Sequence, residues 1–167
     1  MTDEMDPELK VASAEQFKAL GHPMRHRLLF ALGQEPATIS QLAVSLNTRK
    51  GNVAHHLGVL REAGMVRVVE TRQVRGGTEQ YYRRSARMLT FSPEAERATV
   101  GPTLQAVAGE LENATETLLL KLRNQRLTKS QAEALSARLE SLIDELPDAG
   151  PGESRYGIVA TVYQTPS

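Results

Sequence analysis

Apolar residues in the stretch 14–63 recur three and four positions apart, which is the spacing of helices buried along one side. The pattern predicts four short helices, at residues 14–20, 24–32, 39–46 and 50–63. Thr38 followed by Gln41 is a capping-box pattern that marks the start of the third helix. Residues 1–12 are polar and are expected to lack regular structure.

After Gly64 the spacing changes from helical to alternating, which is typical of half-buried strands. Residues 65–73 and 79–84 are predicted to pair as a β-hairpin. Its tip is expected at Gly76-Gly77, because glycine adopts the positive φ angles that tight hairpin turns require. Two helices across the turn at residues 47–49, followed at once by a hairpin, form the pattern of a winged helix-turn-helix.

The residues that follow the hairpin predict a further strand and a helix. Residues 87–91 could form a third strand, ended by Ser92-Pro93. Pro102 can open a helix, since proline suits the first helical turn. The apolar face of this helix would comprise Leu104, Val107, Leu111 and Ala114.

The remaining segment is harder to interpret from periodicity. Residues 117–126 fit a helical stripe or an alternating strand, and the strand is favoured because Thr128 with Gln131 starts a new helix. That helix, residues 129–146, carries one apolar face made of Ala132, Leu135, Leu139, Leu142, Ile143 and Leu146. A turn-rich linker at 147–153 then leads to a predicted strand at 156–163, which is β-branched and aromatic.

These elements predict an α+β protein with two parts. Residues 14–91 would form a winged helix-turn-helix domain, and residues 92–167 a C-terminal α+β region for dimerisation and effector binding. Charge is segregated in the same way. Residues 15–90 hold 12 Lys and Arg against 5 Asp and Glu, a net charge of +7, whereas the whole chain sums to zero. The asymmetry points to a polyanionic partner for the front part alone.

Composition excludes several classes of site and of protein. The chain has no cysteine, which removes disulfides, thiolate metal sites and cysteine nucleophiles. No apolar run approaches the ~20 residues needed to span a bilayer. The first residues, MTDEMDPELK, are acidic and polar, unlike a signal peptide. We therefore expect a cytoplasmic protein without a membrane partner.

The predicted helix at 50–63 carries polar residues suited to DNA near its start. Asn52 can pair with adenine through two hydrogen bonds, and Lys50 can donate to guanine or to phosphate. Recognition helices contact base edges with their N-terminal residues, which is where both lie. Arg49 in the preceding turn is a candidate for contact with phosphate or equally with a base edge, and Thr48 beside it is a further candidate for DNA contact. The alternative is an ordinary solvated start of a helix.

The adjacent His55 and His56 could suggest a metal site. Neighbouring side chains on a helix point about 100° apart, so this pair cannot chelate one ion together. His56 lies three residues from both Val53 and Val59 and is expected to border the core, while His55 is expected to face DNA. No metal and no cofactor are predicted, and we expect zinc, cadmium, nickel or arsenite to leave DNA affinity unchanged.

The hairpin is the second candidate for DNA contact. Its arginines flank a glycine tip that would let the backbone approach phosphates, so the hairpin would be the wing of the winged helix-turn-helix. The alternative is a basic hairpin that is only solvated. Of Tyr81 and Tyr82, on opposite faces, one is expected in the core and the other toward DNA or a second subunit. The candidate contacts here are Arg72, Arg75, Gly76, Gly77 and Thr78, with Arg83 and Arg84 nearby.

Three strings carry a resemblance to a known family: GHPMRHRLLFAL, ISQLAVSLNTRKGNVAHHLGVLREAGMVRVV and VRGGTEQYYR. Over roughly residues 14–88 the chain resembles the winged helix-turn-helix of ArsR-like bacterial repressors. The resemblance implies a homodimeric cytoplasmic repressor that leaves DNA when an effector binds. Metal-sensing members of that family carry cysteines near the third helix, or histidine and acidic ligands on a C-terminal helix. This chain has no cysteine and no histidine beyond His56, so we expect a branch that does not sense metals.

The sequence thus predicts a sequence-specific, homodimeric DNA-binding regulator of transcription. Its effector would be a small molecule or a protein, bound by apolar surfaces within residues 100–163, or absent. A protein-interaction module that kept the fold but lost DNA binding is the alternative, although such modules usually lose the basic wing. No nucleophile–base set, paired carboxylates or phosphate loop stands out, so an enzyme is not expected.

Overall fold

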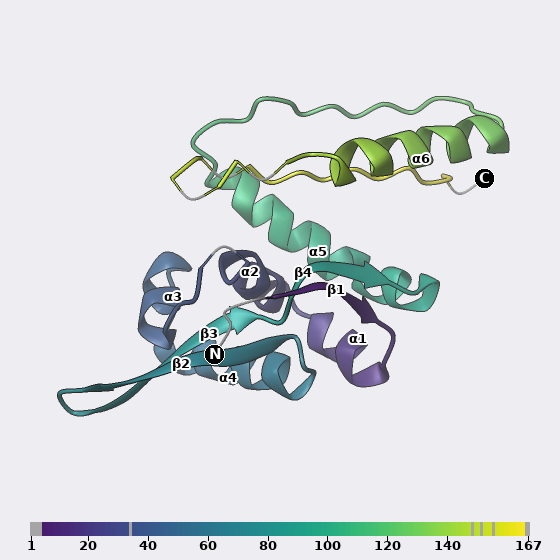
Figure 1. Cartoon of the computed structure of the whole chain (residues 1–167). Helices are drawn as coiled ribbons and strands as arrows, with labels where there is room; N and C mark the ends of the chain where they lie inside the picture. The colour runs from purple at the N-terminus through teal and green to yellow at the C-terminus, as the bar shows by residue number, and fades with distance from the viewer. Residues whose placement is uncertain (1–4, 34, 148, 151, 155, 166–167) are drawn as a thin grey trace. The chain divides into compact units, whose positions relative to one another are not determined.

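The computed structural model describes residues 5–33, 35–147, 149–150, 152–154 and 156–165. The chain divides into two units, Met1–Thr117 and Leu118–Ser167 (Figure 1). The first unit contains the predicted winged helix-turn-helix, and the second contains one helix among its described residues.

The four predicted helices of the first unit are confirmed. They are α1 (Ala14–Leu20), α2 (Pro23–Ala31), α3 (Ile39–Ser45) and α4 (Lys50–Glu62). The predicted capping box at α3 is present, with Gln41 N donating to Thr38 Oγ1 at 3.2 Å and Thr38 N donating to Gln41 Oε1 at 2.8 Å. Ser13 and Gln16 form an equivalent box at α1. These caps satisfy backbone groups that a short helix would otherwise leave unpaired.

The predicted hairpin is also confirmed. Strands β2 (Val66–Val74) and β3 (Gly77–Arg84) are antiparallel, and Val74 lies opposite Gly77. The connection is therefore Arg75-Gly76, in which Gly76 has a φ of 105°. This positive φ explains why glycine is needed in so short a turn.

The prediction that residues 1–12 lack regular structure is wrong. Strand β1 (Asp6–Val11) pairs in parallel with β4 (Ala86–Phe91), which confirms the third strand predicted at 87–91. Within β1 only Val11 is buried, and Leu9 packs partly against the core. A strand this polar gives almost no periodic signal, and its partner lies far along the sequence, so its pairing cannot be read locally.

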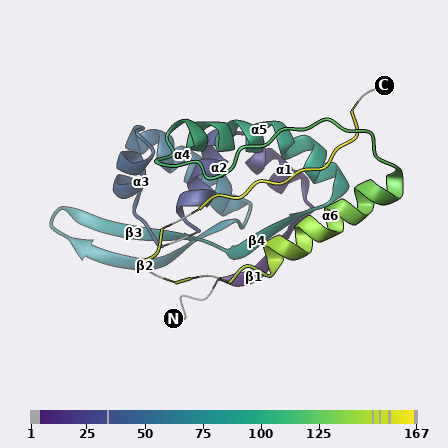
Figure 2. The same cartoon turned by 90° about the horizontal axis from the view of Figure 1, so that it is seen from above.

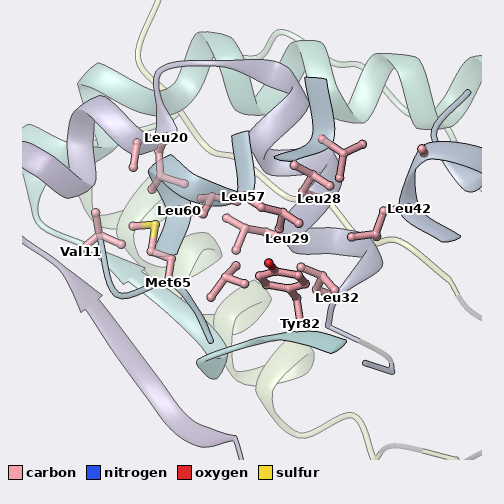
Figure 3. Packing of buried hydrophobic residues seen from close by; sticks show 14 of the residues in the cluster. Val11, Leu20, Leu28, Leu29, Leu32, Leu42, Leu57, Leu60, Met65 and Tyr82 are labelled. Atoms are coloured by element: carbon pink, nitrogen blue, oxygen red, sulfur yellow. The ribbon is translucent and has the colours of Figure 1, made fainter. Parts of the chain in front are cut away.

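A single cluster of buried side chains holds these elements together (Figure 3). The buried leucines come from α1, α2, α3 and α4, and Tyr82 of β3 closes the cluster from the hairpin. Three α4 residues in this core, Val53, Leu57 and Leu60, are at most 1% exposed. Burying a side chain of this size contributes roughly 1.5–3 kcal/mol. The core therefore fixes which face of α4 is left for solvent.

Helix α5 (Pro93–Glu112) begins earlier than predicted. Ser92 Oγ accepts from Ala95 N at 3.2 Å and Pro93 occupies the first turn, so Ser92-Pro93 opens the helix. Pro102 lies inside α5, and the prediction that it opens a helix is wrong. The predicted apolar face is wrong as well. Leu104 and Leu111 are each 46% exposed and Ala114 follows the helix, whereas the buried residues are Ala95, Thr99 and Ala106.

The second unit confirms one predicted helix and neither predicted strand. Helix α6 (Lys129–Asp144) carries the predicted capping box between Thr128 and Gln131. The described residues of 117–126 and 156–163 form no strand, so both strand predictions are wrong for this chain alone. A strand needs a hydrogen-bonded neighbour as well as the right residues, and the described residues provide none. Within the predicted linker 147–153, residues 148 and 151 lie outside the described part of the chain.

Candidate nucleic-acid interface

The turn between α3 and α4 presents the first group of candidate residues. Asn47 adopts a φ of +48°, a left-handed conformation that asparagine tolerates better than most residues. Thr48 N donates to Ala43 O at 2.9 Å, which ties the turn to the end of α3. Arg49 then caps α4 with its backbone, and its side chain makes no capping hydrogen bond. The turn that the sequence predicts at 47–49 is confirmed.

Exposed polar side chains mark the start of α4. Arg49, Lys50 and Asn52 are exposed and Thr48 is half-buried. Asn52 Nδ2 donates to Thr48 Oγ1 at 3.0 Å, so the turn helps to orient the Asn52 amide. Together with Asn47, the residues Thr48, Arg49 and Asn52 line a shallow, open hollow. Amide, hydroxyl and cationic groups thus meet at the helix N-terminus, whose partial positive charge also favours an anion.

The side of α4 that faces away from the core includes two glycines. The buried residues of α4 lie on one side, and a turn of 100° per residue places Gly51, His55 and Gly58 on the other. A Cβ added at Gly51 or Gly58 would meet nothing within 4 Å. Glycine destabilises a helix by about 1 kcal/mol relative to alanine, and nothing in the chain's own packing requires it here. Sequence reasoning missed this feature, although two glycines seven positions apart on the polar face could have indicated it.

His55 and His56 have different surroundings. His56 is 6% exposed, its ring lies 4.5 Å from the His22 ring, and Arg25 Nη1 lies 3.4 Å from its Nδ1. Burial, followed by the charges of His22, Arg25 and His55, lowers the pKa of His56 to about 4. The prediction that His56 borders the core is confirmed, and His55 is exposed. No group of three or more metal-ligating side chains occurs among the described residues.

The hairpin provides the second group of candidates and projects beyond the helices of its unit (Figures 1 and 2). Arg75, Gly76, Gly77 and Thr78 lie at its exposed tip. Gly76 and Gly77 have φ angles of 105° and 152°, and a Cβ added at either would meet nothing within 4 Å. Within the described part of the chain, no hydrogen bond or ion pair joins the Arg75 side chain to another residue. The tip can therefore approach a partner closely with its backbone and with one cation.

Arg72 lies further back on the hairpin and is already engaged. Its Nε donates to Glu70 Oε1 at 2.5 Å and its Nη2 to Glu70 Oε2 at 2.9 Å. Its guanidinium also lies 4.5 Å from the centre of the Tyr81 ring. The Glu70 carboxylate thus offsets the positive charge of Arg72, which the sequence makes a candidate for contact with DNA. Arg75 is consequently more available than Arg72 to a partner outside the chain.

The base of the hairpin is fixed to the helices. Tyr82 is 7% exposed in the core, which confirms that one of the two tyrosines is buried, and its backbone bonds to Ala37 just before α3. Arg84 Nε donates to Ala86 O at 2.6 Å, and its guanidinium lies against Gly33. Arg84 is thus a structural residue at the base. The candidate residues form two groups, at the start of α4 and at the hairpin tip, both carried by one core.

Comparison with known proteins supports the helix-turn-helix assignment. Residues 20–69 match the family model of a helix-turn-helix domain. A search of curated proteins found no match. No helix among the described residues is long and apolar enough to cross a membrane.

Three solved structures illustrate the likeness. A possible transcriptional regulatory protein from Mycobacterium bovis (fragment 1–100) is 25% identical, with 58% of this chain and 90% of that chain covered and a TM-score of 0.37. The transcriptional repressor BigR from Xylella fastidiosa is 27% identical, with 55% and 80% covered and a TM-score of 0.34. The homodimeric winged helix-turn-helix domain of Mb0332 from Mycobacterium bovis, a possible ArsR-family regulator, is 28% identical, with 62% and 85% covered and a TM-score of 0.36.

Proposed function

We propose that this chain, whose winged helix-turn-helix resembles that of ArsR-like regulators, is a sequence-specific DNA-binding regulator of transcription. It would act as a homodimeric repressor in the cytoplasm and leave DNA when a small-molecule or protein effector binds. The proposal assigns it no enzymatic activity. It rests on the fold and the placement of polar groups, together with the residue-level resemblance.

The observation that carries the proposal is the exposed face of α4. Buried Val53, Leu57 and Leu60 fix the helix by one side, and the opposite side presents cations and an amide at its start. Two glycines on that side leave its backbone accessible at a cost to helix stability. A helix fixed in this way, with its N-terminal residues exposed, is the arrangement that enters the major groove in helix-turn-helix proteins.

Different residues would have different roles at the DNA. Asn52 would read adenine through its amide, and Lys50 would contact guanine or phosphate. Thr48 and Arg49 would hold the adjacent phosphates, and His55 would face the groove. At the wing, Arg75 and the backbone of Gly76, Gly77 and Thr78 would contact the flanking backbone, with a smaller contribution from Arg72.

Two copies are needed for an affinity in the usual range. One small reader makes few phosphate contacts, whereas a two-fold dimer places two recognition helices about 34–36 Å apart, on successive major grooves. We therefore expect a palindromic or nearly palindromic operator. Binding-site selection from random DNA with the purified chain would recover two half-sites about one helical turn apart.

The selected site then allows a test of base reading. Asn52→Ala should cost about 1–3 kcal/mol on that site and little on random DNA, because the Asn52 amide contacts a base edge. Fluorescence anisotropy measures both affinities. Asn113→Ala is the matched control, since Asn113 lies at the end of α5 and bonds locally to Gly109 O. It should change neither affinity.

Two results would count against the proposal at different levels. If Asn52→Ala weakened both DNAs equally, base reading by Asn52 would be wrong while DNA binding would stand. If selection recovered no motif and the chain bound no DNA, the protein-interaction module would be the better account.

A further inference from the structure

Among its described residues, the second unit has apolar side chains but no buried core. Leu118, Leu120 and Leu122 are 70–86% exposed, and Tyr156 and Tyr163 are 60% and 63% exposed. Helix α6 has no buried residue, and on its apolar stripe Ala132, Leu139 and Ile143 are partly buried. Monomeric soluble proteins rarely leave apolar residues exposed in this density, and such surfaces mark contact with another molecule.

The backbone of the same segments is unpaired. Residues 118–127 and 156–165 are extended, drawn without arrows in Figure 1, and no backbone hydrogen bond joins them to another described residue. Unpaired backbone N–H and C=O groups on an extended chain are a template for strand pairing. Residues 156–163 add β-branched and aromatic side chains, whereas residues 118–127 add leucines at alternate positions 118, 120 and 122. The sequence pattern predicts a strand at 156–163 and favours a strand over a helix at 117–126, and neither segment has a hydrogen-bonded neighbour among the described residues.

The pattern of residues 156–163 indicates that both faces of this strand must be covered by apolar side chains. Ile158 and Val162 point to one side of an extended chain, and Val159 and Tyr163 to the other. A strand that is apolar on both faces belongs in a sheet covered on both faces. The described residues after Thr117 contain one helix with one apolar stripe, which can cover only one face. A second copy of the chain would bring the second helix.

Charge in this unit is self-complementary. Residues 118–129 carry four cations and no acid, whereas residues 130–153 carry six acids and one arginine. In a two-fold dimer each surface meets the other copy's counterpart, so a surface with separated positive and negative parts can pair with itself.

The size of the surface also fits a dimer. The surface comprises 24 residues a side: residues 118–127, residues 156–163, the five apolar positions of α6, and Leu146 just after the helix. A stable interface uses roughly 20–30 residues a side. A two-stranded parallel pair within one chain would be marginal by comparison.

We propose that residues 156–163 of one copy pair with residues 118–127 of a second copy, and the reverse, in an intermolecular β-sheet with one α6 on each face. The assembly is independent of DNA binding and would stand if the regulator assignment failed. In this assembly the C-terminal unit forms its β-sheet only in the dimer.

Mixed isotope labelling of the full chain tests this proposal without assuming a register. Equal amounts of a perdeuterated copy, with back-exchanged ¹⁵N amides, and a copy with ¹³C-labelled leucine methyls would be unfolded together and refolded as a mixture. Nuclear Overhauser cross-peaks are then expected between amides of 156–163 in one copy and methyls of Leu118, Leu120 or Leu122 in the other. Their absence from the mixture would overturn the proposal, whether the segments pair within one chain or do not pair.

A variant provides the second test. Ile158→Lys should abolish the intermolecular cross-peaks, because it places a charge at the centre of the sheet. Val44→Lys is the matched control, since Val44 is 82% exposed on α3 in the first unit. It should keep the cross-peaks, and both variants should keep the first unit's amide spectrum apart from shifts near the changed residue. Persistence of the cross-peaks in Ile158→Lys would contradict the proposed sheet.

Discussion

Gly51 and Gly58 lower the stability of α4, and an added Cβ at either would make no contact within the chain. Gly51 lies in the first turn of α4 and Gly58 in its interior, both opposite the buried residues, where an added Cβ would meet nothing within 4 Å. A residue that weakens its own helix without serving packing is best explained by a partner that approaches the backbone. If α4 is the recognition helix, as proposed above, that partner would be the floor of the major groove.

Replacing these glycines by alanine should separate stability from binding. Gly51→Ala and Gly58→Ala should each raise the free energy of unfolding by up to about 1 kcal/mol, because alanine favours the helix. Each should also weaken DNA binding by about tenfold, or 1.4 kcal/mol, because the added methyl meets DNA. Urea unfolding and fluorescence anisotropy measure the two effects. Gly109→Ala in α5, also open to solvent, is the control and should stabilise without weakening DNA binding.

The His56 environment makes stability depend on pH. Its pKa is lowered to about 4 in the folded chain, whereas the unfolded chain takes up the proton near pH 6.5. Below about pH 6.5 protonation therefore favours the unfolded state, and the loss of stability from this group continues down to about pH 4. The pKa values of His22 and His26, which are also lowered chiefly by burial, shift in the same sense.

Urea unfolding at pH 7.5 and pH 5 checks this expectation. His56→Leu should flatten the decrease in unfolding free energy over this range by an amount on the order of 1–3 kcal/mol. His55→Gln, at the exposed neighbouring position, should retain the decrease. An unchanged decrease in His56→Leu would show that another group dominates the response.

At the scale of elements, two arginines of the wing differ in their contacts. Arg75 at the tip is exposed, while Arg72 is paired with Glu70 and stacked on Tyr81. A phosphate contact from Arg72 would have to replace that ion pair, whereas one from Arg75 would not. The two arginines therefore form an internal comparison within one hairpin.

Arg75→Ala should weaken binding to the selected site and to random DNA equally, because phosphates are the same in both. It should also reduce the slope of log affinity against log salt by about 1 for each phosphate that is no longer neutralised. Arg72→Ala should have a smaller effect on affinity and slope. Anisotropy titrations over a range of salt measure both quantities together. A larger effect from Arg72→Ala would reverse the proposed order of the two residues.

Local signals make the helix-turn-helix predictable. Capping residues, spacing of three and four, and glycines at turns lie within a few positions of the structure that they determine. This is why the pattern predicts α1 to α4 and the hairpin closely. The exposed positions of Lys50, Asn52 and His55 follow from the helix they occupy, and the position of His56 follows from its spacing to apolar neighbours. Their contacts with DNA, and those of Thr48 and Arg49 in the preceding turn, stay predictions.

Features that depend on distant partners are not predictable in this way. The polar β1 becomes a strand because β4 lies beside it, and the face of α5 is chosen by its packing on α1 and α2. Pro102 is tolerated inside α5, and the hydroxyls of Thr99 and Thr103 bond back to the carbonyls of Ala95 and Thr99 around it. Residues 156–163 have strand composition but no neighbour to pair with among the described residues, and residues 117–126 have alternating leucines alone. Sequence composition alone does not reveal where that neighbour lies.

At the scale of the whole molecule, charge and fold agree. The net charge of +7 lies within residues 15–90, which contain both groups of candidate contacts, and the rest of the chain offsets it. A protein that grips a polyanion releases counterions from it, so its affinity must depend steeply on salt. A winged helix used only for protein contacts would not be expected to show this steep salt dependence.

The salt dependence of DNA binding tests the central proposal most directly. With about 6–10 phosphates neutralised per dimer, affinity measured by fluorescence anisotropy should fall on the order of a thousandfold or more between about 50 and 200 mM salt. Log affinity should decrease linearly with log salt, and the Arg75→Ala line should be shallower. An affinity that stays flat over this range, or no measurable binding at the lowest salt, would contradict a DNA-binding role for this protein.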